Sequence, residues 1–420
     1  MILYLVLALL FMAMGASIAI TIGLVSILYI FFNDIPINII TQKLITGVDV
    51  SALLAIPLFI LAGDIMGKGG LAQRIIRLAS SLIGRVSGGL GIITVIACMF
   101  FAAISGSGVA TAAALGSLMI PSMINKGYDK GFASSIVATA SPLGVIIPPS
   151  ISFIIYANLT GASVSDLYKA GLPAGLFVGI ALILLFYFLA KKQGIKADHD
   201  PFNSKEFFSA LKESIWALGT PFILVGGVFG GIFTPTESAA VAVIYALFVA
   251  IFIYKDLKWK DLFPLLVGSA KMTANIMFII TNASLLAWVL TSEGIPQALV
   301  TSLIGITENP IALLLIINLI ILIVGTFMET SAILVILVPL FLPVVTSLGM
   351  DPVHFGIIVT INTAIGLVTP PFGVCLFTAA SVGKVAIHKI SKHVALPIIV
   401  MIIVLLFITF VPASVMFLID

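Results

Sequence analysis

Charged residues are scarce in this chain of 420 residues. Asp, Glu, Lys and Arg make up only 9% of it, whereas soluble domains carry about a quarter. Hydrophobic residues make up 61%, and the mean hydropathy is +1.29. This composition excludes a soluble protein, and apolar stretches of spanning length recur from end to end, so the lipid bilayer is the expected surroundings. Nothing in the sequence supports nucleic-acid binding.

Cysteine and clustered histidine are also lacking. The chain has two cysteines, Cys98 and Cys375, both in apolar stretches where they are expected to be small buried side chains. They exclude a disulfide framework and a cysteine metal site. No nucleophile–base pair or zinc motif stands at membrane depth, so neither an enzyme nor an organic cofactor is expected. The histidines lie apart at helix ends or in polar loops: His199, His354, His388 and His393.

What the chain does contain is a copy of itself. A shift of 222 positions, with no gap, places Gly144 on Gly366 and Pro148-Pro149 on Pro370-Pro371. Single matches of Gly and Pro are common, but six in one frame indicate two related halves, as in many secondary transporters. The other matches in this frame are Pro121 with Pro343, Gly127 with Gly349, and Asp129 with Asp351.

Each half is expected to hold the same five elements in the same order. These are a span, an amphipathic arm at the membrane surface, a hairpin, a broken helix and a last span. In the first half they cover 51–66, 71–85, 88–124, 131–158 and 166–190. In the second half they cover 271–290, 295–304, 310–346, 352–382 and 394–418. Two further spans lie between the halves, at 213–232 and 236–254, and 1–32 is either one long span or two short helices hinged at Gly15-Ala16-Ser17.

The Lys and Arg residues set the orientation, because cytoplasmic flanks hold most of them. With the 191–212 loop inside, 18 of the 20 fall on that side, and only Lys43 and Lys169 lie opposite. This holds only if both hairpins enter the membrane and return to the side they came from, the first from the cytoplasm and the second from outside. The side of the N-terminus stays open. The inner set is Lys68, Arg74, Arg77, Arg85, Lys126, Lys130, Lys191, Lys192, Lys196, Lys205, Lys212, Lys255, Lys258, Lys260, Lys271, Lys384, Lys389 and Lys392.

The expected fold is therefore an all-α polytopic membrane protein of two inverted repeats, each with a re-entrant hairpin and a Pro-broken helix. Irregular backbone at membrane depth is tolerated only where protein or a water-filled cavity surrounds it. Four such places occur: the hairpin tips at 104–111 and 324–330, and the breaks at 141–150 and 362–371.

Proline has no backbone N–H, so each proline at the breaks leaves the carbonyl four residues before it without its helical hydrogen-bond donor. The breaks are therefore predicted to hold unpaired carbonyls. These carbonyls belong to Gly144, Val145, Gly366 and Leu367. With nearby hydroxyls they would form one oxygen cage for Na⁺ in each repeat, and Na⁺ is the only metal ion expected. The candidate sodium-binding residues are Ser105, Gly106, Ser107, Gly108, Ser141, Gly144, Gly325, Thr326, Glu329, Asn362, Gly366 and Thr369.

No Arg or Lys occurs in either hairpin or at either break, so an anion would be held by half-helix N-termini, hydroxyls, amides and bound Na⁺. These residues also have purely structural interpretations. The small residues would allow close helix packing, the prolines would form simple kinks, and the polar side chains would form ordinary interhelical hydrogen bonds. The candidate substrate-binding residues are Ser107, Thr111, Ser150, Asn158 and Asn362.

Three acidic residues lie near the core. Glu329 at the second tip would ligate a cation, take a proton or cap the helix that starts there. Glu237, after Thr234-Pro235-Thr236, is expected to cap a helix, and Asp64 to make a surface or arm contact.

Several ordered motifs identify a family. Over essentially its whole length the chain resembles the large membrane subunit (M, or DctM-like) of tripartite ATP-independent periplasmic (TRAP) transporters. The matching stretches are Ser105-Gly106-Ser107-Gly108-Val109-Ala110-Thr111, Pro121-Ser122-Met123, Gly127-Tyr128, Ala140-Ser141-Pro142-Leu143-Gly144 through Pro148-Pro149-Ser150, Phe233-Thr234-Pro235-Thr236-Glu237-Ser238-Ala239-Ala240 and Val368-Thr369-Pro370-Pro371-Phe372-Gly373.

The resemblance implies Na⁺-driven import of a small organic acid, such as a C4-dicarboxylate or sialic acid, across the bacterial inner membrane. It implies a four-helix membrane subunit (Q) and a periplasmic substrate-binding protein (P) that largely chooses the substrate. Because Q is fused ahead of M in some members and no such extension is seen here, a separate Q is expected. A stand-alone Na⁺ or H⁺ coupled carboxylate transporter is the main alternative; a channel and an intramembrane enzyme are weaker ones.

The resemblance also implies an elevator mechanism, in which a transport domain slides against a scaffold. The transport domain would comprise 86–160 and 306–384. The scaffold would comprise 1–85 with the first arm, 161–305 with the second arm, and a C-terminal helix in 385–420.

Overall fold

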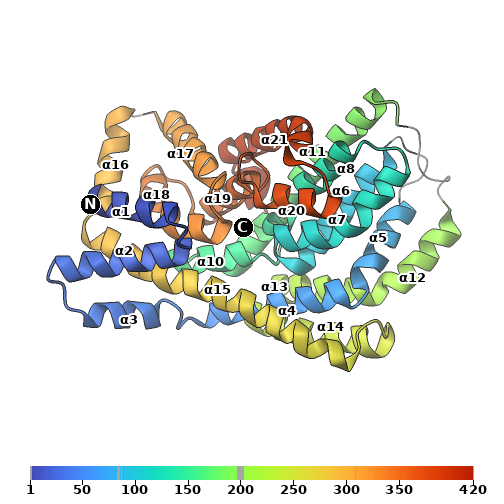
Figure 1. Ribbon diagram of the computed structural model, residues 1–420, viewed down its shortest axis with the longest axis horizontal. Helices are drawn as coiled ribbons and strands as arrows, with labels where there is room; N and C mark the ends of the chain where they lie inside the picture. The colour runs from blue at the N-terminus through green and yellow to red at the C-terminus, as the bar shows by residue number, and fades with distance from the viewer. Residues whose placement is uncertain (1, 83–85, 87, 196–202, 308, 420) are drawn as a thin grey trace.

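A computed structural model describes residues 2–82, 86, 88–195, 203–307 and 309–419, and every regular element in these ranges is helical (Figure 1). Seven helices are long and apolar enough to cross a membrane, or eight if one bent pair counts as a span. This confirms the predicted all-helical, multi-pass fold. Arg85, Lys196 and His199, which the sequence analysis placed in polar segments, lie outside the described residues.

The first repeat follows the predicted order. Its hairpin turns at Gly106-Ser107, and its broken helix is bent by 41° between Ile146 and Ile151. Asp129 caps the broken helix by accepting hydrogen bonds from the backbone N–H groups of Gly131 (2.8 Å) and Phe132 (3.0 Å). The elements are a 3₁₀ turn at Ser51–Leu54 leading into α4 (Ala55–Lys68), α5 (Leu71–Leu82), α6 (Gly89–Ser105), α7 (Gly108–Asn125), α8 (Lys130–Ala140), α9 (Leu143–Ile146), α10 (Ile151–Thr160) and α11 (Val164–Lys192).

The second repeat reproduces the first in detail. Asp351, the counterpart of Asp129, caps its broken helix through the N–H groups of Val353 (2.7 Å) and His354 (3.4 Å). Gly127 and Gly349 turn the chain just before these caps at φ +88° and +81°, which only glycine adopts freely. The elements are α15 (Trp259–Ser292), α16 (Ile295–Ile306), α17 (Pro310–Gly325), α18 (Thr330–Ser347), α19 (Pro352–Gly366), α20 (Val374–Gly383), α21 (Ile387–Phe410) and α22 (Ala413–Met416).

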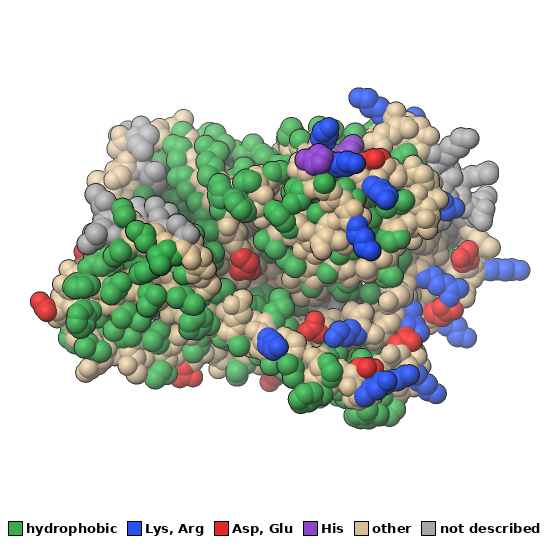
Figure 2. Space-filling model, in the orientation of Figure 1, with side chains coloured by type: hydrophobic (Ala, Val, Ile, Leu, Met, Phe, Trp, Pro, Cys, Tyr) green, Lys and Arg blue, Asp and Glu red, His purple; other side chains and the backbone are tan. Residues whose placement is uncertain are grey.

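The two repeats face opposite ways. In Figure 1 the first hairpin, α6–α7, lies in the right half and the second, α17–α18, in the left half. The arms α5 and α16 lie at the corresponding ends, each packed on its own hairpin. Figure 2 shows the Lys and Arg side chains gathered over the right half of the visible face. By the positive-inside rule, the right end is the one expected to face the cytoplasm.

The helices form an inner bundle and an outer layer. The inner bundle comprises α6–α11 and α17–α21, and the repeats interlock there because α7 packs along α20 and α10 along α18. In the outer layer, α4 packs on α14 and α15, α15 packs on α2 and α3, and α5 packs on α12. The outer layer comprises α1 (Ile2–Ala13), α2 (Ile18–Phe32), α3 (Asn38–Thr46), α4, α5, α12 (Ser204–Pro221), a π-helical turn at Phe222–Gly226, α13 (Gly227–Phe229), α14 (Pro235–Phe248), a π-helical turn at Val249–Ile253, α15 and α16.

Two helices of the predicted scaffold pack on the hairpins and broken helices. The scaffold is predicted to include 166–190 and 385–420, whereas α11 packs against α6 and α19, and α21 against α8 and α19. The two helices also pack on each other. Leu167, Tyr168 and Phe186 of α11 are buried. Both helices are therefore part of the inner bundle.

Other boundaries also differ from the sequence prediction. The predicted segment 1–32 holds two helices, α1 and α2, with Gly15 at φ +87° between them. The helix predicted at 271–290 begins at Trp259, so Lys271 lies well inside it rather than at its cytoplasmic start. The helix expected from 213 begins at Ser204, because Asn203 caps it there through the N–H of Lys205 (3.0 Å).

Candidate functional site

The first hairpin tip is a cluster of hydroxyl and carbonyl oxygens. The hydroxyls of Ser105 and Thr111 lie 2.9 Å apart, and the Thr111 hydroxyl donates to the Ser107 carbonyl at 2.8 Å. Ser107 begins α7, where its own hydroxyl accepts from the Ala110 N–H at 3.4 Å. Ser105 and Thr111 are buried. Two hydroxyl oxygens and one backbone oxygen therefore meet at the start of a half-helix, which the Ser107 hydroxyl caps.

Glycines bring this tip against the first helix break. A Cβ added to Gly144 would lie 2.7 Å from both the Ser107 carbonyl and the Thr111 hydroxyl oxygen. At Gly106, with φ +58°, an added Cβ would lie 2.9 Å from the Pro149 carbonyl. No side chain fits at such distances, so glycine permits the approach. The structure thus brings together the tip and the break that the sequence analysis paired.

The second tip and the second break approach each other in the same way. A Cβ added to Gly366 would lie 2.5 Å from the Gly325 carbonyl oxygen. Beside this contact, the Asn362 side-chain N–H₂ donates to the backbone and side-chain oxygens of Asn318, both at 2.9 Å. The Asn362 side-chain oxygen is buried and finds no hydrogen-bond donor among the described residues.

Asn318 is a residue that sequence reasoning missed. It is the one amide in the otherwise apolar run from Ile311 to Val324, and that contrast was the available signal. Its own side-chain N–H₂ donates to the Leu314 carbonyl at 2.9 Å, which fixes its oxygen toward Asn362.

The expectation of free carbonyls at the breaks is wrong for three of the four. The Val145 carbonyl accepts from the Ser150 hydroxyl (2.5 Å), that of Gly366 from the Thr369 N–H (3.1 Å), and that of Leu367 from the Cys375 N–H (2.9 Å). Ser150 and Cys375 supply these donors from just beyond the proline pairs, whereas Thr369 donates from the turn that precedes its pair. A carbonyl oxygen keeps a second lone pair, so these groups retain acceptor capacity.

The remaining candidate side chains are held within their own elements. Ser141 donates to the Ala138 carbonyl (3.0 Å), Thr326 to that of Ile323 (2.8 Å), and Thr369 to that of Ile365 (2.7 Å). Asn158 is not brought to the tips: it lies two turns beyond Ser150 in α10, about 12 Å along the helix axis. A Cβ added to Gly108 would lie 3.4 Å from both the Pro142 α-carbon and the Leu367 side chain, so the first tip lies against both breaks.

The acidic residues have clear roles in the structure. Glu329 caps α18, where its carboxylate accepts from the N–H and the hydroxyl of Ser331, both at 3.1 Å. Glu237 accepts from the N–H (2.8 Å) and hydroxyl (2.9 Å) of Thr234, which confirms the predicted cap. Asp64 accepts from the Ser269 hydroxyl of α15 at 2.5 Å, a contact with a spanning helix rather than with the arm.

Three cavities lie where the hairpin tips face α15. The inner cavity, of about 380 Å³, holds Asp64, Lys68 and Ser105 in its lining. The outer cavity, of about 350 Å³, is lined by Ser17 at the start of α2, by Asn275 and by Glu329. A narrow space of about 50 Å³ runs between the two tips. Glu329 therefore caps a helix and also faces a cavity between the inner bundle and the outer layer.

Comparison with known proteins agrees with this architecture. The family described as "Tripartite ATP-independent periplasmic transporter, DctM component" matches residues 5–414. The chain belongs to this DctM family. It is accordingly a transporter component rather than an enzyme, and a multi-pass protein of the bacterial inner membrane.

Several relatives with descriptive names align over most of this DctM chain. The C4-dicarboxylate TRAP transporter large permease DctM of Vibrio cholerae is 41% identical, over 96% of this chain and 93% of that protein. The sialic acid TRAP transporter large permease SiaM of the same species is 38% identical, over 88% and 86%. The isethionate TRAP transporter permease DctMQ of Oleidesulfovibrio alaskensis is 44% identical over 97% of this chain, which spans 64% of that longer protein.

A solved structure shares the fold. The YdaH transporter of Alcanivorax borkumensis, described as having an unusual topology, superimposes with a TM-score of 0.62 over 89% of this chain and 87% of its own. The two sequences are only 13% identical, so this likeness concerns the fold alone.

Proposed function

We propose that this chain imports a small organic acid by coupling its movement to the inward flow of Na⁺. The observation that carries the proposal is the pair of oxygen-lined sites at the tips and breaks. The strongest single observation is the buried Asn362 side-chain oxygen, which has no donor among the described residues. An acceptor left unsatisfied in this way costs about 1–3 kcal/mol, and a bound cation would remove that cost.

The donor set fits Na⁺ in both repeats. In the first repeat Ser105, Ser107 and Thr111 offer hydroxyl and carbonyl oxygens, with the Gly144 backbone alongside. In the second repeat Asn362 offers its buried side-chain oxygen, and the Gly366 backbone of the same helix lies against Gly325 of the second tip. Hard oxygen ligands of this kind suit alkali and alkaline-earth ions rather than metals that prefer sulfur or imidazole. When bound, Na⁺ would supply positive charge beside the substrate.

The substrate is proposed to be a small organic acid held without Lys or Arg. The half-helices α7 and α18 both begin at the cavities, and their N-terminal ends carry partial positive charge. Glu329 at the start of α18 would repel an anion on its own, so Na⁺ at the sites is needed to balance the charge. C4-dicarboxylates, sialic acid and isethionate, which appear in the relatives' names, are all small acids and form the first substrate panel.

The movement is proposed to be of elevator type. The inner bundle would slide along the outer layer, and the cavities lie at the boundary between the two. The arms α5 and α16 pack on the hairpins at opposite ends and would link the moving part to the fixed part. Because α11 and α21 pack into the inner bundle, we propose that they travel with it.

Two partner proteins complete the proposal. A small four-helix membrane subunit and a periplasmic substrate-binding protein would act with this chain, as the tripartite family description and the relative named DctMQ suggest. A stand-alone carboxylate transporter would need neither of them.

The test is uptake into proteoliposomes that hold this chain with its small membrane subunit. Labelled acids are added outside with an inward Na⁺ gradient, with and without the purified binding protein. The proposal expects accumulation only when the binding protein is present, and the acid that accumulates names the substrate. Equal accumulation without that protein would instead establish a stand-alone carrier.

A further inference from the structure

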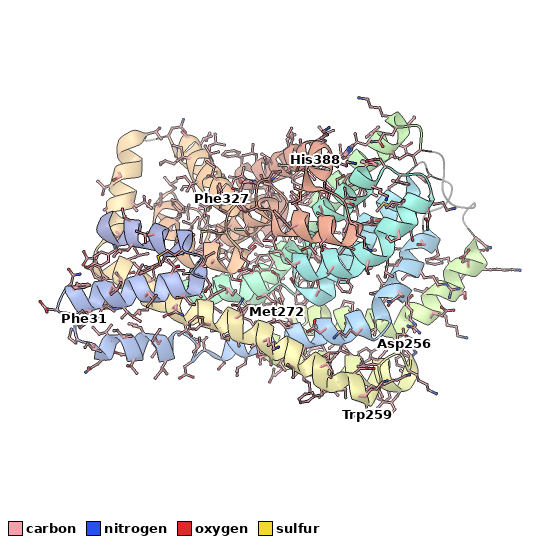
Figure 3. The ribbon with its side chains drawn as sticks, in the orientation of Figure 1. Phe31, Asp256, Trp259, Met272, Phe327 and His388 are labelled. Atoms are coloured by element: carbon pink, nitrogen blue, oxygen red, sulfur yellow. The ribbon has the colours of Figure 1, made fainter. Side chains whose placement is uncertain are left out.

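We propose that Met272, on the outer layer, is the fixed seal that separates the inner cavity from the outer cavity along the transport path. This inference rests on the proposed function. Met272 and Ser107 line all three cavities described above, and no other described residue does so. Ser107 belongs to the first hairpin tip, and Figure 3 places Met272 midway along α15, between Trp259 near one end and the outer end of the helix.

The face of α15 around Met272 changes character along the helix. Three residues before it, Ser269 binds Asp64, which lines the inner cavity. Three residues after it, Asn275 lines the outer cavity together with Glu329. Residues three and four apart share one helix face, so Met272 lies between these two polar positions, with Ile276 beside it in the narrow space and the outer cavity. Met272 is 39% exposed, although it lies at the centre of a spanning helix, because it faces these cavities.

An apolar side chain at this point is suited to sealing. The tips contribute Ser107 and Glu329 to the narrow space, but on its α15 side Met272 offers no polar group to replace the hydration of water or an ion. Methionine is unbranched, with three rotatable bonds, so it adapts its shape to different neighbours. A fixed methionine would therefore stay in contact with the hairpin tip in more than one position of the inner bundle. An open gap here would let Na⁺ pass from the outer to the inner cavity without substrate.

The seal predicts leakage when its volume is removed. In proteoliposomes without substrate or binding protein, Met272→Ala is expected to raise passive Na⁺ entry several-fold, while Met272→Leu, of nearly equal volume, stays close to the unchanged protein. Met277→Ala is the matched control, because Met277 lies on the same helix but packs against the hydrophobic core. Equal Na⁺ entry in Met272→Ala and Met277→Ala would overturn the proposal.

A second variant tests the seal by a different measurement, the rate of substrate uptake. Met272→Trp is expected to slow substrate uptake several-fold without raising Na⁺ entry, because the added bulk obstructs the sliding tip. Uptake at the unchanged rate would also contradict a seal at this position. If the unchanged protein shows no Na⁺-coupled uptake, the proposed function is wrong. If Na⁺-coupled uptake is present but Met272→Ala does not leak Na⁺, only the proposed seal is wrong.

Discussion

Asn362 of the second broken helix donates its side-chain N–H₂ to both oxygens of Asn318 on the second hairpin, each at 2.9 Å. Because both partners are acceptors, the amide of Asn362 has one orientation, with its nitrogen toward Asn318. Its own oxygen is buried without a donor among the described residues. Asn318 thus acts as a positioning residue that presents the Asn362 oxygen to the proposed Na⁺ site.

Removing this partner should weaken Na⁺ binding rather than folding. In Asn318→Leu the Asn362 N–H₂ keeps only the backbone carbonyl of position 318 as an acceptor, so the amide is held less firmly. The Na⁺ concentration for half-maximal uptake should then rise about tenfold, equivalent to about 1.4 kcal/mol. The measurement is the Na⁺ dependence of uptake. Asn282→Ala is the control, because this buried amide donates only to its own helix, to the Phe278 carbonyl. An unchanged Na⁺ dependence in Asn318→Leu would show that the orientation is not used.

The contact between Gly366 and Gly325 should tolerate no side chain. In Gly366→Ala the new Cβ would meet the Gly325 carbonyl oxygen at 2.5 Å, so the second tip must move away from its break. We expect near-complete loss of uptake with the protein still present in the membrane. Gly268→Ala is the control, because nothing lies within 4 Å of that position and the helix gains about 1 kcal/mol from the replacement. Normal uptake in Gly366→Ala would contradict the close approach.

The hydroxyl cluster at the first tip should be needed for Na⁺. Ser107→Ala removes an oxygen at the cavities and the cap of α7, which is worth about 1 kcal/mol. Thr111→Val removes the hydroxyl that joins Ser105 to the Ser107 carbonyl. Both should sharply reduce uptake without loss of membrane expression, whereas Thr111→Ser should retain it. Na⁺ dependence like that of the unchanged protein in both damaged variants would remove these residues from the site.

The two roles of Glu329 can be separated by one substitution. In Glu329→Gln the side-chain carbonyl can still accept from the Ser331 N–H, so the cap on α18 is preserved. The negative charge beside the cavities is lost, and the half-saturating Na⁺ concentration should rise several-fold. Membrane expression and thermal stability should stay unchanged. A rate and Na⁺ dependence that do not change would leave Glu329 with the cap alone.

The parts of this fold that the sequence predicts well are those where the backbone makes an unusual demand. Gly127 and Gly349 take positive φ, Asp129 and Asp351 cap the same helix in each repeat, and the first hairpin turns at Gly106-Ser107. Such positions admit few residue types, so they remain visible in a chain that is otherwise uniformly apolar. The repeat, both hairpins and both breaks follow from them.

The neighbours of each helix are harder to predict. Lipid is as apolar as a leucine side chain, so a helix that faces lipid and one that faces protein have similar compositions. For this reason α11 and α21 were placed in the scaffold although they pack in the inner bundle. Ser150 and Cys375 donate hydrogen bonds to the carbonyls of Val145 and Leu367 at the breaks. These bonds depend on the path of the chain after each break, which the local sequence pattern does not show.

The measurement that tests the central claim most directly is accumulation of the transported acid in proteoliposomes under an imposed Na⁺ gradient that is then collapsed. The Asn362→Ala variant is measured alongside. The account predicts that the unchanged protein concentrates the acid only while Na⁺ flows inward, loses it when the gradient is removed, and gains nothing from a K⁺ gradient of equal size. It predicts little accumulation by Asn362→Ala. The same accumulation with K⁺ as with Na⁺ would contradict the assignment of the two oxygen-lined sites to Na⁺.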